Sequence, residues 1–149
     1  MSEKSVERYL CDISLNVANV AITEIELEKI LVARVIDGDT IELESGDRVR
    51  LIGVDCPECG EDGFEEATQF TRNSVEGKTV WLESDGNDTD GFGRLRRYVW
   101  IQPPTDLKSE EQAKNKMLNA QLLINRYANV AIIGDVRLEA LFRKLACCA

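Results

Sequence analysis

Acidic side chains stand beside glycine and proline at the ends of two predicted strands. The run Asp37-Gly38-Asp39 separates two apolar stretches, and this composition is typical of a tight turn. Asp55 and Glu58 follow the next apolar stretch and flank Pro57, which ends a strand because it cannot donate a ladder hydrogen bond. Carboxylates add nothing to a core there, but oxygen ligands suit a hard cation such as Ca²⁺ or Mg²⁺. Two of these carboxylates, a backbone carbonyl and waters would make an open site, unless the aspartates merely form the turn.

Two arginines could bind a phosphate beside such a cation. Arg50 lies in a strand that is otherwise apolar, and Arg94 follows Gly91-Phe92-Gly93. The planar guanidinium can hold two phosphate oxygens at once. Two arginines, one free carboxylate and a divalent ion are the groups that attack on a phosphodiester requires. The simpler alternative for Arg50 is an ion pair with the same aspartates.

The overall composition limits the possible chemistry. The chain contains no histidine, which excludes imidazole metal sites and Ser-His or Cys-His catalysis within it. Its net charge of -9 opposes nucleic-acid binding, because such proteins usually present a basic face. Four acids that follow Glu58 would repel phosphates, namely Glu61, Asp62, Glu65 and Glu66. A local basic cluster partly offsets them, formed by Arg94, Arg96 and Arg97.

The five cysteines do not favour a zinc site. Cys56 and Cys59 form a C-x-x-C, but the second half would have to come from the adjacent pair Cys147-Cys148. Adjacent cysteines chelate one ion awkwardly, so we expect free thiols rather than zinc ligands. We also expect a cytoplasmic protein without a membrane partner, since neither a signal-peptide pattern nor an apolar run of the ~20 residues that span a bilayer is apparent.

The order of predicted elements favours an α+β fold, a small β-barrel of the oligonucleotide-binding type with flanking helices. The five predicted strands are Glu24–Ile36, Thr40–Leu43, Arg48–Val54, Thr79–Glu83 and Leu95–Ile101. Helices are predicted over about Phe64–Val75, Lys108–Ile124 and Arg137–Leu145, and a short extended segment within Tyr127–Ile133. The polar segment Ser84–Gly93 is interpreted as a solvated loop. Residues 1–24 are interpreted as an extension, with a short amphipathic helix in Ser2–Asn19, and residues 25–149 as the domain.

Taken together, these residues resemble the staphylococcal nuclease family. The resemblance covers about Ile30 to Val130 and rests on four motifs in the family's order: Val35–Ile41 (VIDGDTI), Arg50–Glu58 (RLIGVDCPE), Gly91–Arg94 (GFGR) and Leu118–Leu123 (LNAQLL). It implies a five-stranded barrel with about three helices. It also implies a Ca²⁺-dependent phosphodiesterase that acts on single-stranded DNA or RNA and leaves 3′-phosphate ends.

The resemblance also implies roles for individual residues. Asp39 and Asp55 would be the metal carboxylates, and Cys56 would contribute its backbone carbonyl. Glu58 is similar to the family's general base, and Arg50 and Arg94 to the pair that holds the phosphate and stabilises the transition state. Asn119 matches a position that fixes the helix behind the site, and Asp37 would lie in the outer shell.

Two other classes of function compete with a nuclease. The same fold could serve as a binding module for protein or nucleic acid, which the acidity of the chain would suit. A thiol or zinc protein built on the cysteines is the second alternative.

Overall fold

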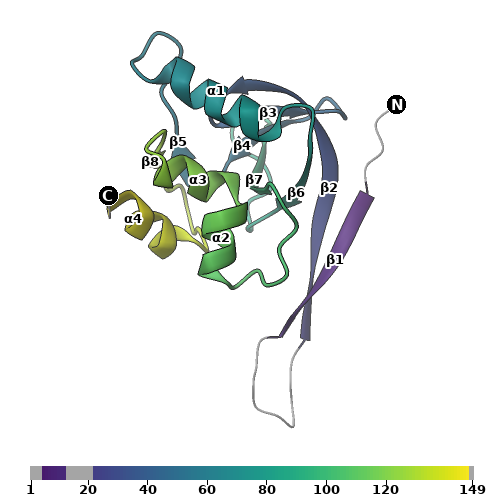
Figure 1. The fold of residues 1–149 in the computed structure, drawn as a ribbon. Helices are drawn as coiled ribbons and strands as arrows, with labels where there is room; N and C mark the ends of the chain where they lie inside the picture. Colours follow the sequence, from purple (N-terminus) through teal and green to yellow (C-terminus); the bar gives the residue numbers. More distant parts are fainter. Residues whose placement is uncertain (1–4, 13–21, 148–149) are drawn as a thin grey trace.

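A computed structural model describes residues 5–12 and 22–147 of the chain (Figure 1). The strands are β1 (Ser5–Asp12), β2 (Ile22–Asp37), β3 (Thr40–Leu43), β4 (Arg48–Leu51), β5 (Val54–Asp55), β6 (Thr79–Glu83), β7 (Leu95–Trp100) and β8 (Asn129–Val130). The helices are α1 (Phe64–Val75), α2 (Glu110–Lys116), α3 (Leu118–Ile124) and α4 (Glu139–Cys147).

Five of the strands close into a barrel. Their order is β2-β3-β4-β7-β6, and β6 pairs back with β2 to complete the ring. The β4–β7 pair is parallel, whereas the other pairs are antiparallel. Closure leaves no unpaired edge within the ring. This is the five-stranded barrel of the oligonucleotide-binding type that the sequence predicted, and its strand directions are mixed.

Strand alternation places the core inside this ring. In β3 and β4, the inward residues Ile41, Leu43, Val49 and Leu51 are almost completely buried. Successive side chains of a strand point to opposite faces, so the polar residues between them face outward or line the site. The helices lie together on one side of the barrel (Figure 1), where α3 contributes the fully buried Leu118 and Leu122.

The N-terminal prediction is wrong where the structure describes it. Residues 5–12 form a strand rather than part of an amphipathic helix, and they pair antiparallel with β2 from Ser5↔Lys29 to Asp12↔Ile22. A near-helical spacing of apolar residues does not exclude pairing with a long neighbouring strand, which decides the outcome here. The rest of that predicted helix, residues 2–4 and 13–19, lies outside the described residues. The division into an extension and a domain at residue 24 stays a prediction.

The long helix predicted from Lys108 to Ile124 is two helices. Met117 separates α2 from α3 in an extended conformation (φ -103°, ψ 125°) and is fully buried. It forms an isolated bridge with Trp100 at the end of β7. Side-chain periodicity continues across this break, so the sequence pattern did not reveal it. The described residues therefore contain four helices where about three were expected, and none of the four is long and apolar enough to cross a membrane.

Candidate active site

The turn between β2 and β3 places a buried carboxylate at the barrel surface. Asp39 is only 6% exposed. Its Oδ1 accepts a hydrogen bond from Thr40 Oγ1 at 3.0 Å, and its Oδ2 accepts one from the Cys56 backbone N–H at 2.8 Å. Thr71 of α1 donates to the Gly38 carbonyl at 2.7 Å and fixes the turn against the helix. The carboxylate is therefore held in place from both sides.

Arg50 of β4 joins the two predicted metal carboxylates. Its Nη2 lies 3.4 Å from Asp39 Oδ2 and 3.1 Å from Asp55 Oδ1. Its Nη1 donates to the carbonyls of Leu51 at 2.9 Å and Val54 at 2.7 Å, across the turn into β5. The ion pair that we gave as the simpler alternative for Arg50 is thus present. It also brings Asp39, Asp55 and Arg50 into one cluster, as the sequence predicted.

Asp37 adds a second acid to the same turn. Its Oδ1 accepts a hydrogen bond from the Asp39 backbone N–H at 3.2 Å. Burial, with the hydrogen bond and negative charge of Asp39 in addition, raises the pKa of Asp37 to about 6. Two neighbouring carboxylates, one of them with its charged form disfavoured, are a suitable environment for a cation. The turn therefore fits a divalent ion electrostatically.

The ligand set for such an ion is incomplete in side chains alone. Among the described residues, no three acidic or thiol side chains converge in a way that could hold a metal. A cation at Asp39 and Asp55 would take its other ligands from backbone carbonyls, water or substrate, as hard cations commonly do. The Cys56 peptide is near enough to contribute, since its N–H bonds Asp39.

The Cys56 thiol is packed in the interior. A Cβ atom on Gly38 would lie 2.8 Å from Cys56 Sγ, so glycine is needed there for the close approach. Burial, and to a smaller extent the charge of Asp39, raises the pKa of the Cys56 thiol. A buried, protonated thiol is a poor nucleophile. The environment of Cys56 thus argues against a reactive thiol at this position.

Arg94 is held by a tight turn that leads into β7. Asp90 Oδ2 accepts a hydrogen bond from Arg94 Nε at 2.7 Å, and its Oδ1 accepts from the backbone N–H groups of Phe92 and Arg94 at 2.8 and 3.0 Å. Gly93 adopts φ 79°, which completes the turn. The Phe92 ring is 85% exposed and lies 5.4 Å from the Arg94 guanidinium carbon.

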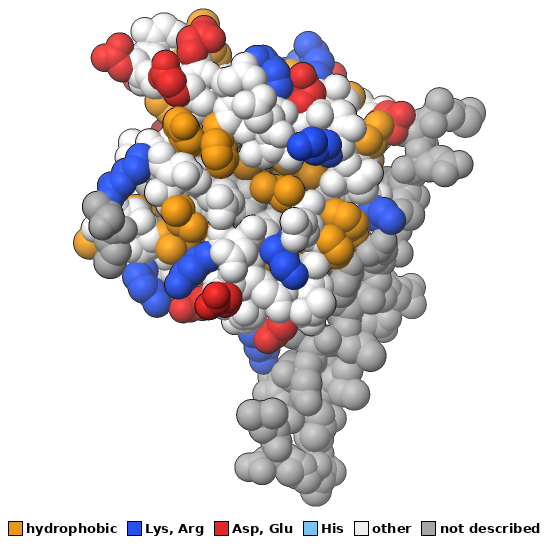
Figure 2. Space-filling view, in the orientation of Figure 1, with side chains coloured by type: hydrophobic (Ala, Val, Ile, Leu, Met, Phe, Trp, Pro, Cys, Tyr) orange, Lys and Arg blue, Asp and Glu red, His pale blue; other side chains and the backbone are white. Residues whose placement is uncertain are grey.

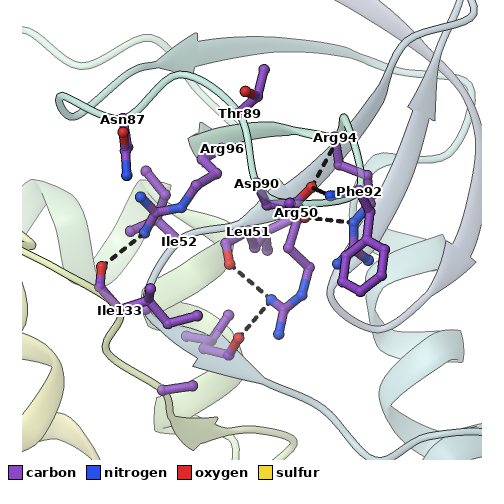
Figure 3. Close-up of a pocket in the computed structure, with 14 residues that line it drawn as sticks. Arg50, Leu51, Ile52, Asn87, Thr89, Asp90, Phe92, Arg94, Arg96 and Ile133 are labelled. Atoms are coloured by element: carbon purple, nitrogen blue, oxygen red, sulfur yellow. Dashed lines mark hydrogen bonds and ion pairs between the residues drawn. The ribbon is translucent and has the colours of Figure 1, made fainter.

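Arg50 and Arg94 line the same cavity (Figure 3). Its volume is about 330 Å³, within the range of small-ligand sites. Its other lining side chains include Phe92, Ile133 and a third arginine, Arg96. The structure thus brings the two predicted phosphate ligands to one concave surface.

Glu58 lies apart from this arrangement. It is exposed in the loop after β5, its backbone N–H donates to Glu61 Oε1 at 2.7 Å, and it does not line the cavity. Its carboxylate has no hydrogen bond or ion pair with another described residue. Glu58 is connected to the cluster through the backbone, because it follows Asp55 by three residues.

Asn119 of α3 is fully buried behind the site. Its Oδ1 accepts from the Val99 backbone N–H at 2.9 Å, and its Nδ2 donates to the Ile52 carbonyl at 2.8 Å. It therefore ties α3 to β7 and to the turn that follows Arg50.

Ser84–Gly93 is the exposed loop that the sequence predicted, but its aspartates form contacts that the prediction did not include. Asp85 accepts a hydrogen bond from Tyr98 Oη at 2.5 Å, Asp88 pairs with Arg97 at 2.8 Å, and Asp90 positions Arg94. The one feature of the sequence that could have indicated such a contact is the spacing of Asp90 and Arg94, four residues apart. Sequence reasoning also missed Arg96 as a cavity residue.

Comparisons with known proteins identify the family and several relatives of this chain. The family model described as "Staphylococcal nuclease homologue" matches residues 48–144. The chain is 40% identical over 88 residues to a thermonuclease of Staphylococcus intermedius, which covers 53% of this chain and 52% of the relative. It is 33% identical over 105 residues to a thermonuclease of Staphylococcus hyicus, with 64% and 61% covered. An uncharacterized endonuclease of Escherichia coli O157:H7 is 42% identical over 72 residues, 46% of each chain.

The fold and the matched region define the class of protein. The residues matched by the family model begin at β4 and include β7, so they contain the parallel strand pair of the mixed barrel. The chain belongs to the staphylococcal nuclease homologue family. It spans about half to three fifths of the length of the thermonucleases it matches.

Proposed function

We propose that this protein is a metal-dependent nuclease that hydrolyses single-stranded DNA or RNA and leaves 3′-phosphate ends. One observation carries the proposal: Arg50 Nη2 lies between Asp39 and Asp55, at 3.4 and 3.1 Å, and the same arginine lines a cavity with Arg94. An ion pair that only stabilised the fold would not require Arg94 to line the same cavity as Arg50. Family membership and the similarity to thermonucleases support the same activity.

The cation is proposed to be Ca²⁺, held by the carboxylates of Asp39 and Asp55 and the Cys56 carbonyl. All three are hard oxygen donors of the kind that Ca²⁺ prefers. When bound, the ion would polarise a phosphate oxygen and neutralise part of its charge. A bound cation would also compete with Arg50 for the aspartates, which would leave guanidinium donors available to the phosphate.

The chain's own residues supply the remaining steps. Arg50 and Arg94 bind the non-bridging oxygens of the scissile phosphate and stabilise the charge that develops on them. Glu58 accepts a proton from the attacking water, whose oxygen bonds to phosphorus. The bond to the 5′ oxygen breaks, that oxygen takes a proton from solvent and Glu58 returns its proton to solvent, so the products carry a 3′-phosphate and a 5′-hydroxyl.

The test is cleavage of single-stranded DNA and of RNA with Ca²⁺, with Mg²⁺ and with chelator. We expect Ca²⁺-dependent cutting by the wild-type chain. Glu58→Gln and Arg94→Ala should each reduce the rate by about 10²-fold or more, as loss of a general base or a transition-state donor does. Glu65→Gln and Arg72→Ala change charge on the exposed face of α1 and should leave the rate within about twofold.

A binding module for protein or nucleic acid is the second candidate. It is favoured by the exposed acids around the start of α1, namely Glu61, Asp62, Glu65 and Glu66, and Figure 2 shows acidic side chains gathered over the loop that precedes this helix. A folded protein that cuts neither substrate at any salt concentration, with every cation tested, would decide for this candidate and against the nuclease.

A further inference from the structure

Arg96 is a third arginine in the cavity, and the sheet positions it beside Arg50. In the parallel β4–β7 pair, Arg50 and Arg96 are register partners. Directly paired residues of neighbouring strands lie about 5 Å apart and point to the same face. Both side chains line the cavity, and Arg96 is only 8% exposed. A buried arginine at this place is therefore part of the cavity wall.

The Arg96 guanidinium has no acidic partner among the described residues. Arg50, Arg94 and Arg97 each form an ion pair with an aspartate. Arg96 instead donates one hydrogen bond, from Nη2 to the Ile133 carbonyl at 3.2 Å. Figure 3 shows its guanidinium directed toward Ile133 on the side of the cavity away from Arg94. The other guanidinium nitrogens of Arg96 are not among the buried atoms that lack a partner, so they face the open cavity and are available to an acceptor on a ligand.

The wall around Arg96 determines which acceptor fits. Ile52 and Ile133 lie on this side of the cavity (Figure 3), and their side chains cannot hydrogen-bond a ligand. A second phosphate would add negative charge beside the phosphate held by Arg50 and Arg94, and it would lose hydration against these apolar side chains, which is unfavourable. A nucleobase is flat, buries its faces against apolar side chains and carries acceptors only on its edge. The geometry therefore favours a base over a second phosphate.

We propose that Arg96 selects guanine as the base next to the phosphate bound by Arg50 and Arg94. The inference rests on the proposed function, because those arginines orient the nucleotide. An arginine fork donates to guanine O6 and N7 together, which no other base matches on one edge. Asn87 also lines the cavity, and an asparagine side chain can form two hydrogen bonds with adenine. A preference for adenine would therefore indicate selection by Asn87 instead of Arg96.

Equilibrium binding of the four nucleoside monophosphates tests the proposal without any cleavage step. GMP should bind the wild-type chain about tenfold more tightly than AMP, CMP or UMP, the discrimination expected for one bidentate pair. Arg96→Leu should abolish this preference. Arg96→Lys keeps the charge and the apolar stem but lacks the fork, so it should also lose the preference while preserving the fold. Arg34→Leu, which replaces an exposed arginine of β2 paired with Glu42, should retain it.

Three results would overturn the assignment. Equal binding of all four nucleotides, or no binding of any, would show that the cavity does not discriminate between bases. Tighter binding of AMP would show that Asn87, rather than Arg96, selects the base. Inorganic phosphate that competes as well as GMP, and loses affinity in Arg96→Leu, would make Arg96 an anion ligand. A GMP preference in a protein that cuts no nucleic acid would instead sustain this inference while the nuclease proposal fails.

Discussion

Asp90 orients the side chain of Arg94. Its two carboxylate oxygens accept three hydrogen bonds, two from backbone N–H groups and one from the Arg94 guanidinium. The Arg94 side chain is therefore already oriented toward the cavity before any substrate binds, and less conformational freedom remains to be lost on binding. This arrangement explains why an acid stands next to a proposed phosphate ligand.

Replacing Asp90 by asparagine should destabilise the fold in a pH-dependent way. Burial raises the pKa of Asp90, but the hydrogen bonds from Phe92 and Arg94 and the charge of Arg94 outweigh it, so the pKa is lowered overall. A lowered pKa in the folded state contributes stability above the unfolded value of about 4, and this stability is lost as pH falls through the folded pKa. We expect Asp90→Asn to lower the free energy of unfolding by about 1 kcal/mol at neutral pH, measured by urea denaturation.

The difference between wild type and Asp90→Asn should shrink as pH falls below about 4, where the native carboxylate becomes protonated. Asp62→Asn, at an exposed acid, serves as the control and should show no such trend. A constant difference from neutral to acidic pH would contradict the role given to the charge of Asp90.

At the scale of elements, Asn119 joins three parts of the fold. It connects α3 to β7 through Val99 and to the β4–β5 turn through Ile52. In that turn Gly53 adopts φ 80°, and a Cβ there would lie 2.6 Å from the ring of Phe142 in α4. The turn that follows Arg50 is thus clamped between two helices, and Arg50 bonds both of its ends.

Asn119→Ala should cost about 2–4 kcal/mol of unfolding free energy, because it leaves a buried N–H and a buried carbonyl without partners. Asn125→Ala, at an exposed position at the end of α3, should cost less than about 0.5 kcal/mol. Chemical denaturation of both variants measures the difference. Equal effects would mean that Asn119 is not the tie between these elements.

The elements that the sequence predicted correctly are those with local signals. β3, β6 and α1 have their predicted bounds, because turn residues and a change of periodicity mark both ends. The break at Met117 and the strand at residues 5–12 depend on contacts with β7 and β2, which are distant in sequence or conflict with the local pattern. Tertiary pairing overrides local preference at such places.

At the scale of the whole molecule, the site exists only because the barrel closes. Asp39 lies between β2 and β3, Arg50 on β4, Asp55 on β5 and Arg94 immediately before β7. The motifs predicted this grouping. The sequence could not show that Arg96 would face the same cavity, since that follows from the parallel register of β4 and β7. It also could not show that the acids of residues 85–90 would bind arginines and backbone groups.

The net charge of -9 acts on this site from a distance. The acids of the α1 end raise the cost of bringing a polyanion near, whereas three cavity arginines attract it locally. Interactions between exposed charges are largely screened beyond about 8 Å at physiological salt, but the close contacts in the cavity are screened less. Cleavage rates measured at about 0.15 M salt should therefore depend on the cavity residues more than on the surface charge.

The most direct test of the account is the Ca²⁺-dependent cleavage rate of Asp55→Asn at that salt concentration. The Asp55 side chain is 58% exposed and forms its ion pair with Arg50 alone, so this isosteric change should leave the fold intact. If Asp55 is a metal ligand, the rate on single-stranded DNA should fall by about 10²-fold or more relative to wild type. A folded Asp55→Asn protein that cuts at the wild-type rate would contradict the site described above.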